Sequence, residues 1–293
     1  MGWIAVGVVV IVLVVFGVVL ATRSPSTPTS STGDAAGRNP AAAAASVTGP
    51  LASIPKSVFD SVGTAGGPAS LTVTAKQPKL LSSGKPEFVY LGAEYCPFCA
   101  MDRWAMVAAL NRFGSFTGLK QITSSSTDSA YQSIPTLSFY GAKYTSPYLV
   151  FSPYESEDIA GQPLMNIPTD KQALYSTYDG SNSGTGTKFD GGNAGIPFVD
   201  IANQYVSAGA PGTYSPVAAA LQHNGLTYTQ IAQAVANPSS AVGTAMGAKY
   251  LVAEANYLSA GICNVNGNKP ASVCSSAGVL AAKKVLAAAP KVS

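Results

Sequence analysis

Residues 88–110 read FVYLGAEYCPFCAMDRWAMVAAL, and this stretch decides the fold. Its first six residues form a continuous apolar run, which is typical of a β-strand buried on both faces. After the CPFC tetrapeptide, Met101, Trp104 and Ala108 recur at the spacing of one helix face. The sequence therefore predicts that CPFC lies where a buried strand is followed by a helix.

Two cysteines at the start of a helix have a direct redox rationale. The thiolate is the attacking species, and the unpaired N–H groups and dipole at a helix N-terminus stabilise its negative charge. We expect Cys96, the nearer and more exposed thiol, to be the nucleophile and Cys99, one turn later, to resolve the mixed disulfide. Pro97 suits the first helical turn, where its missing N–H costs nothing. A zinc site is the alternative for this spacing.

The other two cysteines, Cys263 and Cys274, flank a loop in ICNVNGNKPASVC. We expect them to form a structural disulfide, which would stabilise the fold by about 2–3 kcal/mol in the chain-entropy model. A joint zinc site with CPFC would need both pairs to meet, and ten intervening residues exceed the usual ligand spacing. We therefore expect no metal. Because disulfides persist in oxidising compartments, four paired cysteines predict a domain outside the cytoplasm.

The rest of the chain predicts an α/β core with a helical C-terminal extension. Pro197 opens a second buried strand, followed by a turn and a further short strand, and helices begin beyond Pro216. We expect a helix at 169–178 with Thr169 as its N-cap, because threonine is a preferred capping residue. The remaining expected elements are strands at 119–123, 136–144, 148–152 (the last two a hairpin across 145–147), 198–202 and 205–207, and a long helix at 239–261.

The order of strand, CPFC, helix and a later strand opened by Ile196-Pro197 resembles the thioredoxin superfamily. In that superfamily the matching proline is cis and faces the two cysteines, which implies that Ile196 and Pro197 help to bind substrate beside the dithiol. A closer resemblance, to the prokaryotic domain-of-unknown-function family 929, covers most of residues 50–290. It is carried by GKPEFVYLGAEYCPFCAMDRWAMVAALNRFG, IPTLSFYGAKYTSPYLVFSPYE, GIPFVDIANQY and ICNVNGNKPASVC. That family is thioredoxin-like and generally has an N-terminal membrane segment. The resemblance implies a thioredoxin-like core with an inserted hairpin and loop.

The N-terminus predicts a membrane anchor. Residues 1–22 contain no ionisable side chain, and the apolar run from Trp3 to Ala21 would span about 28 Å as a helix, against a hydrocarbon core of about 30 Å. A cleaved signal peptide is the alternative, but no Lys or Arg precedes the run. We expect a retained single-pass anchor at residues 1–22 with its N-terminus in the cytoplasm, and a flexible Ser/Thr/Pro/Ala tether at 23–50. The thioredoxin-like domain would then cover 51–215 and the extension 216–293.

Charge and histidine content exclude several functions. Charged residues make up 11% of the chain, against about 25% in ordinary soluble domains, and the formal net charge is +3. A net charge of +3 over 293 residues does not provide the basic surface that binds phosphates, so we expect no nucleic-acid partner. His223 is the sole histidine and lies beside a turn signal, so we expect it at the surface.

Other residues near the motif have competing interpretations. Glu94 would either relay protons to the dithiol or be a solvated residue at the strand end. Asp102 and Arg103 follow Cys99 closely, whereas Trp104 and Phe113 are expected to pack between helix and sheet.

A loop with calcium-like spacing occupies residues 179–190, but it lacks the final Glu of calcium-binding loops. We instead expect residues 180–195 to form a mobile loop that borders the dithiol and shapes access for substrate chains.

The sequence as a whole predicts a membrane-tethered thiol–disulfide oxidoreductase that acts on extracytoplasmic protein thiols and disulfides. The dithiol itself would carry the electrons, so no cofactor is expected, and an unidentified electron-transfer partner would reset it. The alternative is a non-enzymatic thioredoxin-like binding module in which CPFC is a structural disulfide.

Overall fold

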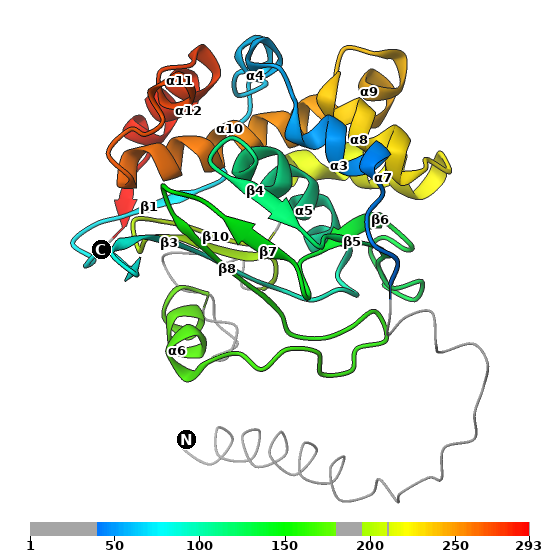
Figure 1. The fold of residues 1–293 in the computed structure, drawn as a ribbon, viewed down its shortest axis with the longest axis horizontal. Coiled ribbons are helices and arrows are strands. Elements are labelled where there is room, and N and C mark those ends of the chain that lie inside the picture. The colour runs from blue at the N-terminus through cyan, green and yellow to red at the C-terminus, as the bar shows by residue number, and fades with distance from the viewer. Residues whose placement is uncertain (1–39, 180–194, 210, 293) are drawn as a thin grey trace, which may run out of the picture. The chain divides into compact units, whose positions relative to one another are not determined.

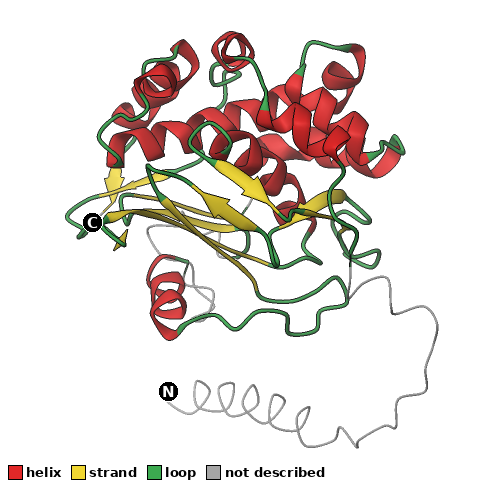
Figure 2. Ribbon diagram, viewed as in Figure 1, coloured by secondary structure: helices red, strands yellow, loops and turns green. Residues whose placement is uncertain are grey.

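The computed structural model describes residues 40–179, 195–209 and 211–292. These residues form an α/β fold in which helices cover one face of a twisted sheet (Figure 1, Figure 2). Helix α6 (Thr169–Tyr178) lies on the opposite face. The predicted α/β class is therefore confirmed.

The main sheet is built around β3 (Lys85–Gly92), the strand that leads into CPFC. Strand β8 (Val150–Glu155) pairs parallel to β3, and β9 (Phe198–Ile201) pairs antiparallel to it. From β9 the sheet continues through β10, β1 and β11, while the short β2 pairs with the start of β3. The bounds of these strands are β10 (Tyr205–Ala208), β1 (Thr72–Thr74), β11 (Lys291–Val292) and β2 (Leu81–Ser82).

Both faces of β3 are buried, which explains its continuous apolar run. Phe88 and Tyr90 belong to the main core together with Trp104. Leu91 belongs instead to a separate cluster with Tyr178 at the end of α6. Successive residues of a strand point to opposite faces, so a strand covered by helices on both sides needs apolar residues throughout.

The helical layer is centred on α5 (Pro97–Leu110) and α10 (Ala248–Val265), which pack against each other. Nearly all of α5 is buried, including Met101, Trp104 and Leu110. The remaining helices are α3 (Ala45–Ala52), α4 (Lys56–Val62), η2 (Gly212–Tyr214, a 3-10 turn), α7 (Ser215–His223), α8 (Tyr228–Ala236), α9 (Ala241–Met246), α11 (Ala271–Cys274) and α12 (Ala277–Ala288).

The predicted hairpin after residue 136 is wrong. The expected strand at 136–144 is two strands, β6 (Pro135–Ser138) and β7 (Lys143–Thr145), separated by a reversal at Gly141, whose φ is +78°. Strand β6 pairs with β5 (Lys120–Thr123), and β7 pairs with β4 (Ser115–Thr117). The hairpin partner expected of β7 is β8, which joins the main sheet beside β3 instead.

Two helix boundaries also differ from the prediction. Helix α6 has the expected range, but Pro168 is its N-cap and Thr169 is its first residue, with no side-chain capping bond. The expected helix at 239–261 is divided at Gly247, which adopts a left-handed φ of +71° between α9 and α10. Only glycine adopts this conformation without steric cost, so the chain turns there.

The folded part begins before the predicted end of the tether at Pro50. Helix α3 starts at Ala45, and its Val47 and Leu51 are each 1% exposed. The predicted C-terminal extension is likewise continuous with the core, because α10 packs on α5 and β11 pairs with β1.

Within the described ranges, no helix combines the length and apolar character needed to cross a bilayer. The anchor expected at residues 1–22 lies outside those ranges.

Candidate active site

Cys96 and Cys99 lie at the junction of β3 and α5, as the sequence predicts. Cys96 is the N-cap of α5 in an extended conformation, and its Sγ accepts a hydrogen bond from the Cys99 N–H at 3.1 Å. Pro97 occupies the first helical turn. The sulfur of Cys96 thus performs the role that a Ser or Asp oxygen has in an ordinary helix cap.

Both thiols are free and largely enclosed. Cys96 is 4% exposed and Cys99 is fully buried, so the expected difference in exposure exists but is small. The apolar parts of Tyr95, Phe98 and Ile196 pack around them. Cys96 is therefore the more accessible of the two thiols.

The two thiols differ in acidity. Burial opposes ionisation of Cys96, but hydrogen bonds from the Cys99 thiol and the N–H groups of Cys99 and Phe98, with the charge of Arg103, lower its pKa. Burial, reinforced by the adjacent Cys96, raises the pKa of Cys99 well above its usual value. This asymmetry is the one expected of a nucleophile and a resolving thiol.

The loop before β9 faces the dithiol. The Ile196–Pro197 peptide bond is cis, in agreement with the resemblance. The Ile196 carbonyl lies 3.8 Å from Cys96 Sγ and accepts a hydrogen bond from the thiol. Residues one hundred positions apart in the chain are thereby brought together.

A groove with a volume of about 460 Å³ adjoins this loop. Its apolar lining includes Leu91, Tyr95, Ile167 and Ile196. Tyr95 and Ile196 also pack on the cysteines, so the groove and the dithiol share two neighbouring residues.

Glu94 is not a solvated residue at the strand end. It is 2% exposed, and its carboxylate accepts a hydrogen bond of 2.5 Å from Ser138 Oγ. Burial raises its pKa. No hydrogen bond joins Glu94 to either cysteine within the described ranges, so the structure does not bring this predicted relay into contact with the dithiol.

A buried ion pair lies beneath the dithiol. Arg103 donates hydrogen bonds to Glu155 through Nε (2.8 Å) and Nη2 (2.6 Å), and both side chains are fully buried. Nη2 also donates to the Ala93 carbonyl at 2.6 Å, an oxygen that accepts the Cys96 N–H as well. The ion pair is therefore connected to Cys96 through one backbone carbonyl.

The sequence pointed to Arg103 only by proximity, and Glu155 was not identified. Arg103 follows Cys99 by four residues, so it lies on the same face of α5, and that spacing was the available signal. Asp102 faces elsewhere and accepts a hydrogen bond from Tyr214 Oη at 3.0 Å. Trp104 and Phe113 are core residues, as expected.

Among the described residues, no group of three or more His, Cys, Asp or Glu side chains is arranged to hold a metal ion. His223 is exposed at the end of α7, as predicted. Residues 180–194 lie outside the described ranges. They include nearly all of the predicted access loop (180–195) and of the calcium-like segment (179–190).

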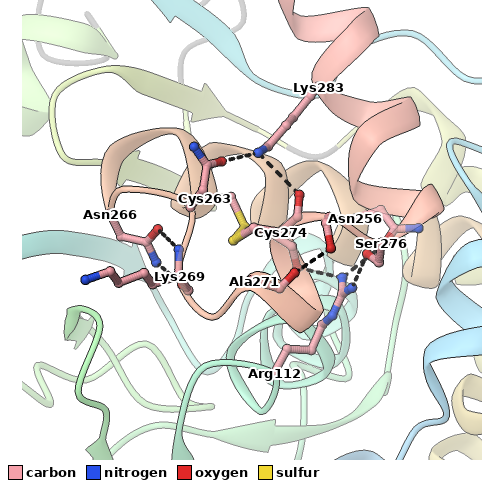
Figure 3. The surroundings of a disulfide bond; sticks show 12 residues. Arg112, Asn256, Cys263, Asn266, Lys269, Ala271, Cys274, Ser276 and Lys283 are labelled. Atoms are coloured by element: carbon pink, nitrogen blue, oxygen red, sulfur yellow. Dashed lines mark hydrogen bonds between the residues drawn. A yellow bond between two sulfur atoms is a disulfide. The ribbon is translucent and has the colours of Figure 1, made fainter.

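Cys263 and Cys274 form a disulfide that joins the end of α10 to α11 (Figure 3). Their surroundings are tied to the core by Arg112, which donates to Asn256 Oδ1 at 3.1 Å and to Ser276 Oγ at 3.1 Å. Both cysteines are buried. Its position makes this disulfide a connection between helices, away from CPFC.

Comparison with known proteins gives a family and nothing closer. No curated protein and no solved structure matches the chain. One family model matches residues 72–264, a range that begins at β1 and contains CPFC, Ile196–Pro197 and most of α10. Because the match covers well over half of the chain, the protein belongs to the family described as Domain of unknown function (DUF929).

Proposed function

We propose that this protein is a thiol–disulfide oxidoreductase whose working group is the Cys96–Cys99 dithiol. The placement of the two sulfurs carries the proposal: Cys96 caps α5 and its Sγ accepts a hydrogen bond from the Cys99 N–H, whereas Cys99 is fully buried. In keeping with this placement, the pKa of Cys96 is lowered and that of Cys99 is raised. A purely structural pair of cysteines needs no such difference, whereas a nucleophile and a buried resolving thiol do.

The strand arrangement supports a thioredoxin-like core. Strand β3 leads into the CPFC helix, has a parallel neighbour (β8) and an antiparallel neighbour (β9), and β9 is preceded by the cis Ile196–Pro197 bond. Helices α5 and α6 cover opposite faces of this unit (Figure 1). The order of strand, CPFC helix and cis proline before a later strand is the part of this arrangement on which the sequence resemblance rests.

The chemistry is two successive exchanges. The Cys96 thiolate attacks one sulfur of a substrate disulfide, forms a mixed disulfide and releases the other substrate sulfur as a thiolate. Cys99, deprotonated, then attacks Cys96 Sγ, and the second substrate sulfur leaves. The substrate is reduced by two electrons and the protein is left with a Cys96–Cys99 disulfide. Substrate oxidation is the same sequence in reverse.

The groove beside Ile196 supports a protein substrate. An extended segment lying there would have its own sulfur next to Cys96 and apolar side chains against Leu91 and Ile167. Ile196 and Pro197 would thus form the wall against which the segment is positioned.

The location and the partner belong to the same proposal. An anchor at residues 1–22 would hold the domain at the outer surface of the cell membrane, and the Cys263–Cys274 disulfide favours an oxidising compartment. A redox partner must reset the dithiol after each turnover. Its potential decides whether the protein oxidises or reduces its substrates.

The test is to trap the mixed disulfide in cells that express the full chain. Cys99→Ser removes the resolving thiol, so Cys96 should remain bonded to substrate proteins and give adducts that a reductant dissolves. The matched variant Cys96→Ser should give none. If neither variant gives adducts, the oxidoreductase proposal is wrong.

One observation favours the alternative of a non-enzymatic binding module. Cys96 is only 4% exposed, which limits access for a substrate thiol. In that case Cys96→Ser and Cys99→Ser would both leave the cellular partners of the chain unchanged.

A further inference from the structure

The hydroxyl of Tyr90 is buried beside the dithiol without a hydrogen-bond partner. Tyr90 lies in β3 and is fully buried. Within the described part of the chain its Oη is one of four buried side-chain atoms that lack a partner, and Arg103 Nη1 is another. Native structures seldom leave a buried hydroxyl unpaired, because this costs about 1–3 kcal/mol.

Gly92 shows how close this hydroxyl is to Cys99. A Cβ added at Gly92 would lie 2.1 Å from Tyr90 Oη and 3.1 Å from Cys99 Sγ. The hydroxyl and the thiol therefore border the same small space, which exists because position 92 has no side chain. Gly92 allows the two groups to approach each other.

Among the groups around this space, Tyr90 supplies a neutral side-chain donor in addition to the backbone N–H of Ala93, whose hydrogen bond acts to lower the pKa of Cys99. Burial, with the neighbouring cysteines, raises the pKa of Tyr90 well above its usual value although Arg103 acts to lower it, so the phenol keeps its proton. The Arg103 guanidinium lies 6.0 Å from the Tyr90 ring centroid, with Nε and Nη2 engaged by Glu155 and Ala93, while Nη1 has no partner and the charge of Arg103 acts to lower the pKa of Cys99. Glu94 is bonded to Ser138.

We propose that the Tyr90 hydroxyl donates a hydrogen bond to the Cys99 thiolate whenever that thiolate forms during exchange. This role rests on the proposed oxidoreductase function. A neutral thiol is a weak acceptor, which accounts for the unpaired hydroxyl in the dithiol form, whereas a thiolate is a strong one.

The step in which this bond acts is the opening of the Cys96–Cys99 disulfide. A substrate thiolate attacks Cys96 Sγ and forms a new bond to it. The Cys96–Cys99 bond breaks, and its electron pair goes to Cys99, which leaves as a thiolate. The substrate sulfur is oxidised, the protein disulfide is reduced, and Tyr90 keeps its proton while it stabilises the new charge. Cys99 is shielded from water, so its thiolate depends on fixed groups: the charge of Arg103, the Ala93 N–H and, in this proposal, the Tyr90 hydroxyl.

The test compares wild type with Tyr90→Phe, which removes only the hydroxyl. The Cys96–Cys99 disulfide is reduced with glutathione, samples are quenched by alkylation, and the rate is measured by mass spectrometry. A hydrogen bond to a charged group predicts that Tyr90→Phe is slower by about tenfold to a hundredfold. Tyr90→Met, which also lacks the hydroxyl, should show the same slowing.

The control is Tyr144→Phe, which removes a partly buried hydroxyl that bonds the Leu110 carbonyl at 2.8 Å. It should lose stability but keep the wild-type reduction rate. Conversely, Tyr90→Phe should not lose stability, because its hydroxyl is unpaired. A second readout is the pKa of Cys99 in a Cys96→Ser background, which Tyr90→Phe should raise.

The outcomes separate the two proposals. A wild-type protein that exchanges with glutathione, together with a Tyr90→Phe variant that reacts equally fast, would refute the role of Tyr90 alone. A wild-type disulfide that glutathione never opens would refute the oxidoreductase proposal and the role of Tyr90 with it.

Discussion

Cys96 and Cys99 are three residues apart, yet they experience different electrostatic environments. Cys96 caps the helix and receives hydrogen bonds from backbone N–H groups of the first turn. Cys99 is inside the helix, fully buried, and next to the unpaired Tyr90 hydroxyl. The difference follows from position in the helix, since the N-cap side chain of Cys96 can accept hydrogen bonds from the unpaired N–H groups of the first turn, whereas Cys99 belongs to that turn and donates its own N–H to Cys96.

This difference predicts how Cys96 reacts with pH. Its lowered pKa means that its thiolate forms at lower pH than in the unfolded chain. The rate of Cys96 alkylation by iodoacetamide should therefore reach half of its maximum at lower pH in the folded protein than in denaturant, with the site read by mass spectrometry. The denatured chain is the internal control, and coinciding profiles would contradict the assignment of Cys96 as nucleophile.

At the scale of elements, local sequence patterns predicted most of what surrounds the dithiol. The apolar run of β3, the helical spacing of α5 and the strand after Pro197 all depend on neighbouring residues, and the structure has all three. Strand pairing depends on distant residues. Nothing within 136–152 indicates that β7 pairs with β4 while β8 lies beside β3.

Helix α3 was not predicted, because its composition is that of the tether before it. Its sequence, ASVTGPLA, continues an alanine-rich stretch and contains Pro50, so it resembled a linker. Only the burial of Val47 and Leu51 against the rest of the core makes it part of the fold. Short helices are marginal in isolation and depend on such packing.

The docking of α3 predicts a stability effect far from the dithiol. Leu51→Ala should lower the free energy of unfolding by about 2–5 kcal/mol, because it leaves a cavity in the core. Ser57→Ala, an exposed position in α4, should change it by less than about 0.5 kcal/mol. Chemical denaturation measures both. Equal, small effects would mean that α3 does not pack on the core.

At the scale of the whole molecule, the site combines residues that the sequence could identify with others that it could not. CPFC and Ile196–Pro197 have recognisable patterns, and the fold brings them within 3.8 Å of each other. Tyr90 and Glu155 have no pattern, since they matter only through contacts made after folding, and Arg103 had only its spacing from Cys99. Glu94 is conspicuous in the sequence, but the direction of its side chain is set by Ser138, 44 residues away.

The fold also explains why a chain with so few charges places several of them in its interior. The Arg103–Glu155 pair is fully buried, and such pairs cost more in desolvation than most contacts return. Its position beneath CPFC, bonded to Ala93, is consistent with a role in the acidity of Cys96. This one buried pair thus lies close to the proposed chemistry, whereas others, such as Lys171–Glu87, have partners of their own elsewhere in the fold.

The most direct test of the central claim is the redox equilibrium of Cys96 and Cys99 with glutathione. The purified protein is equilibrated at a series of ratios of reduced to oxidised glutathione, and the dithiol fraction is counted by mass spectrometry after alkylation. Reversible interconversion with a potential above about −300 mV, the range below which structural disulfides lie, is the predicted result. A pair that stays fully oxidised or fully reduced across all ratios would contradict the account.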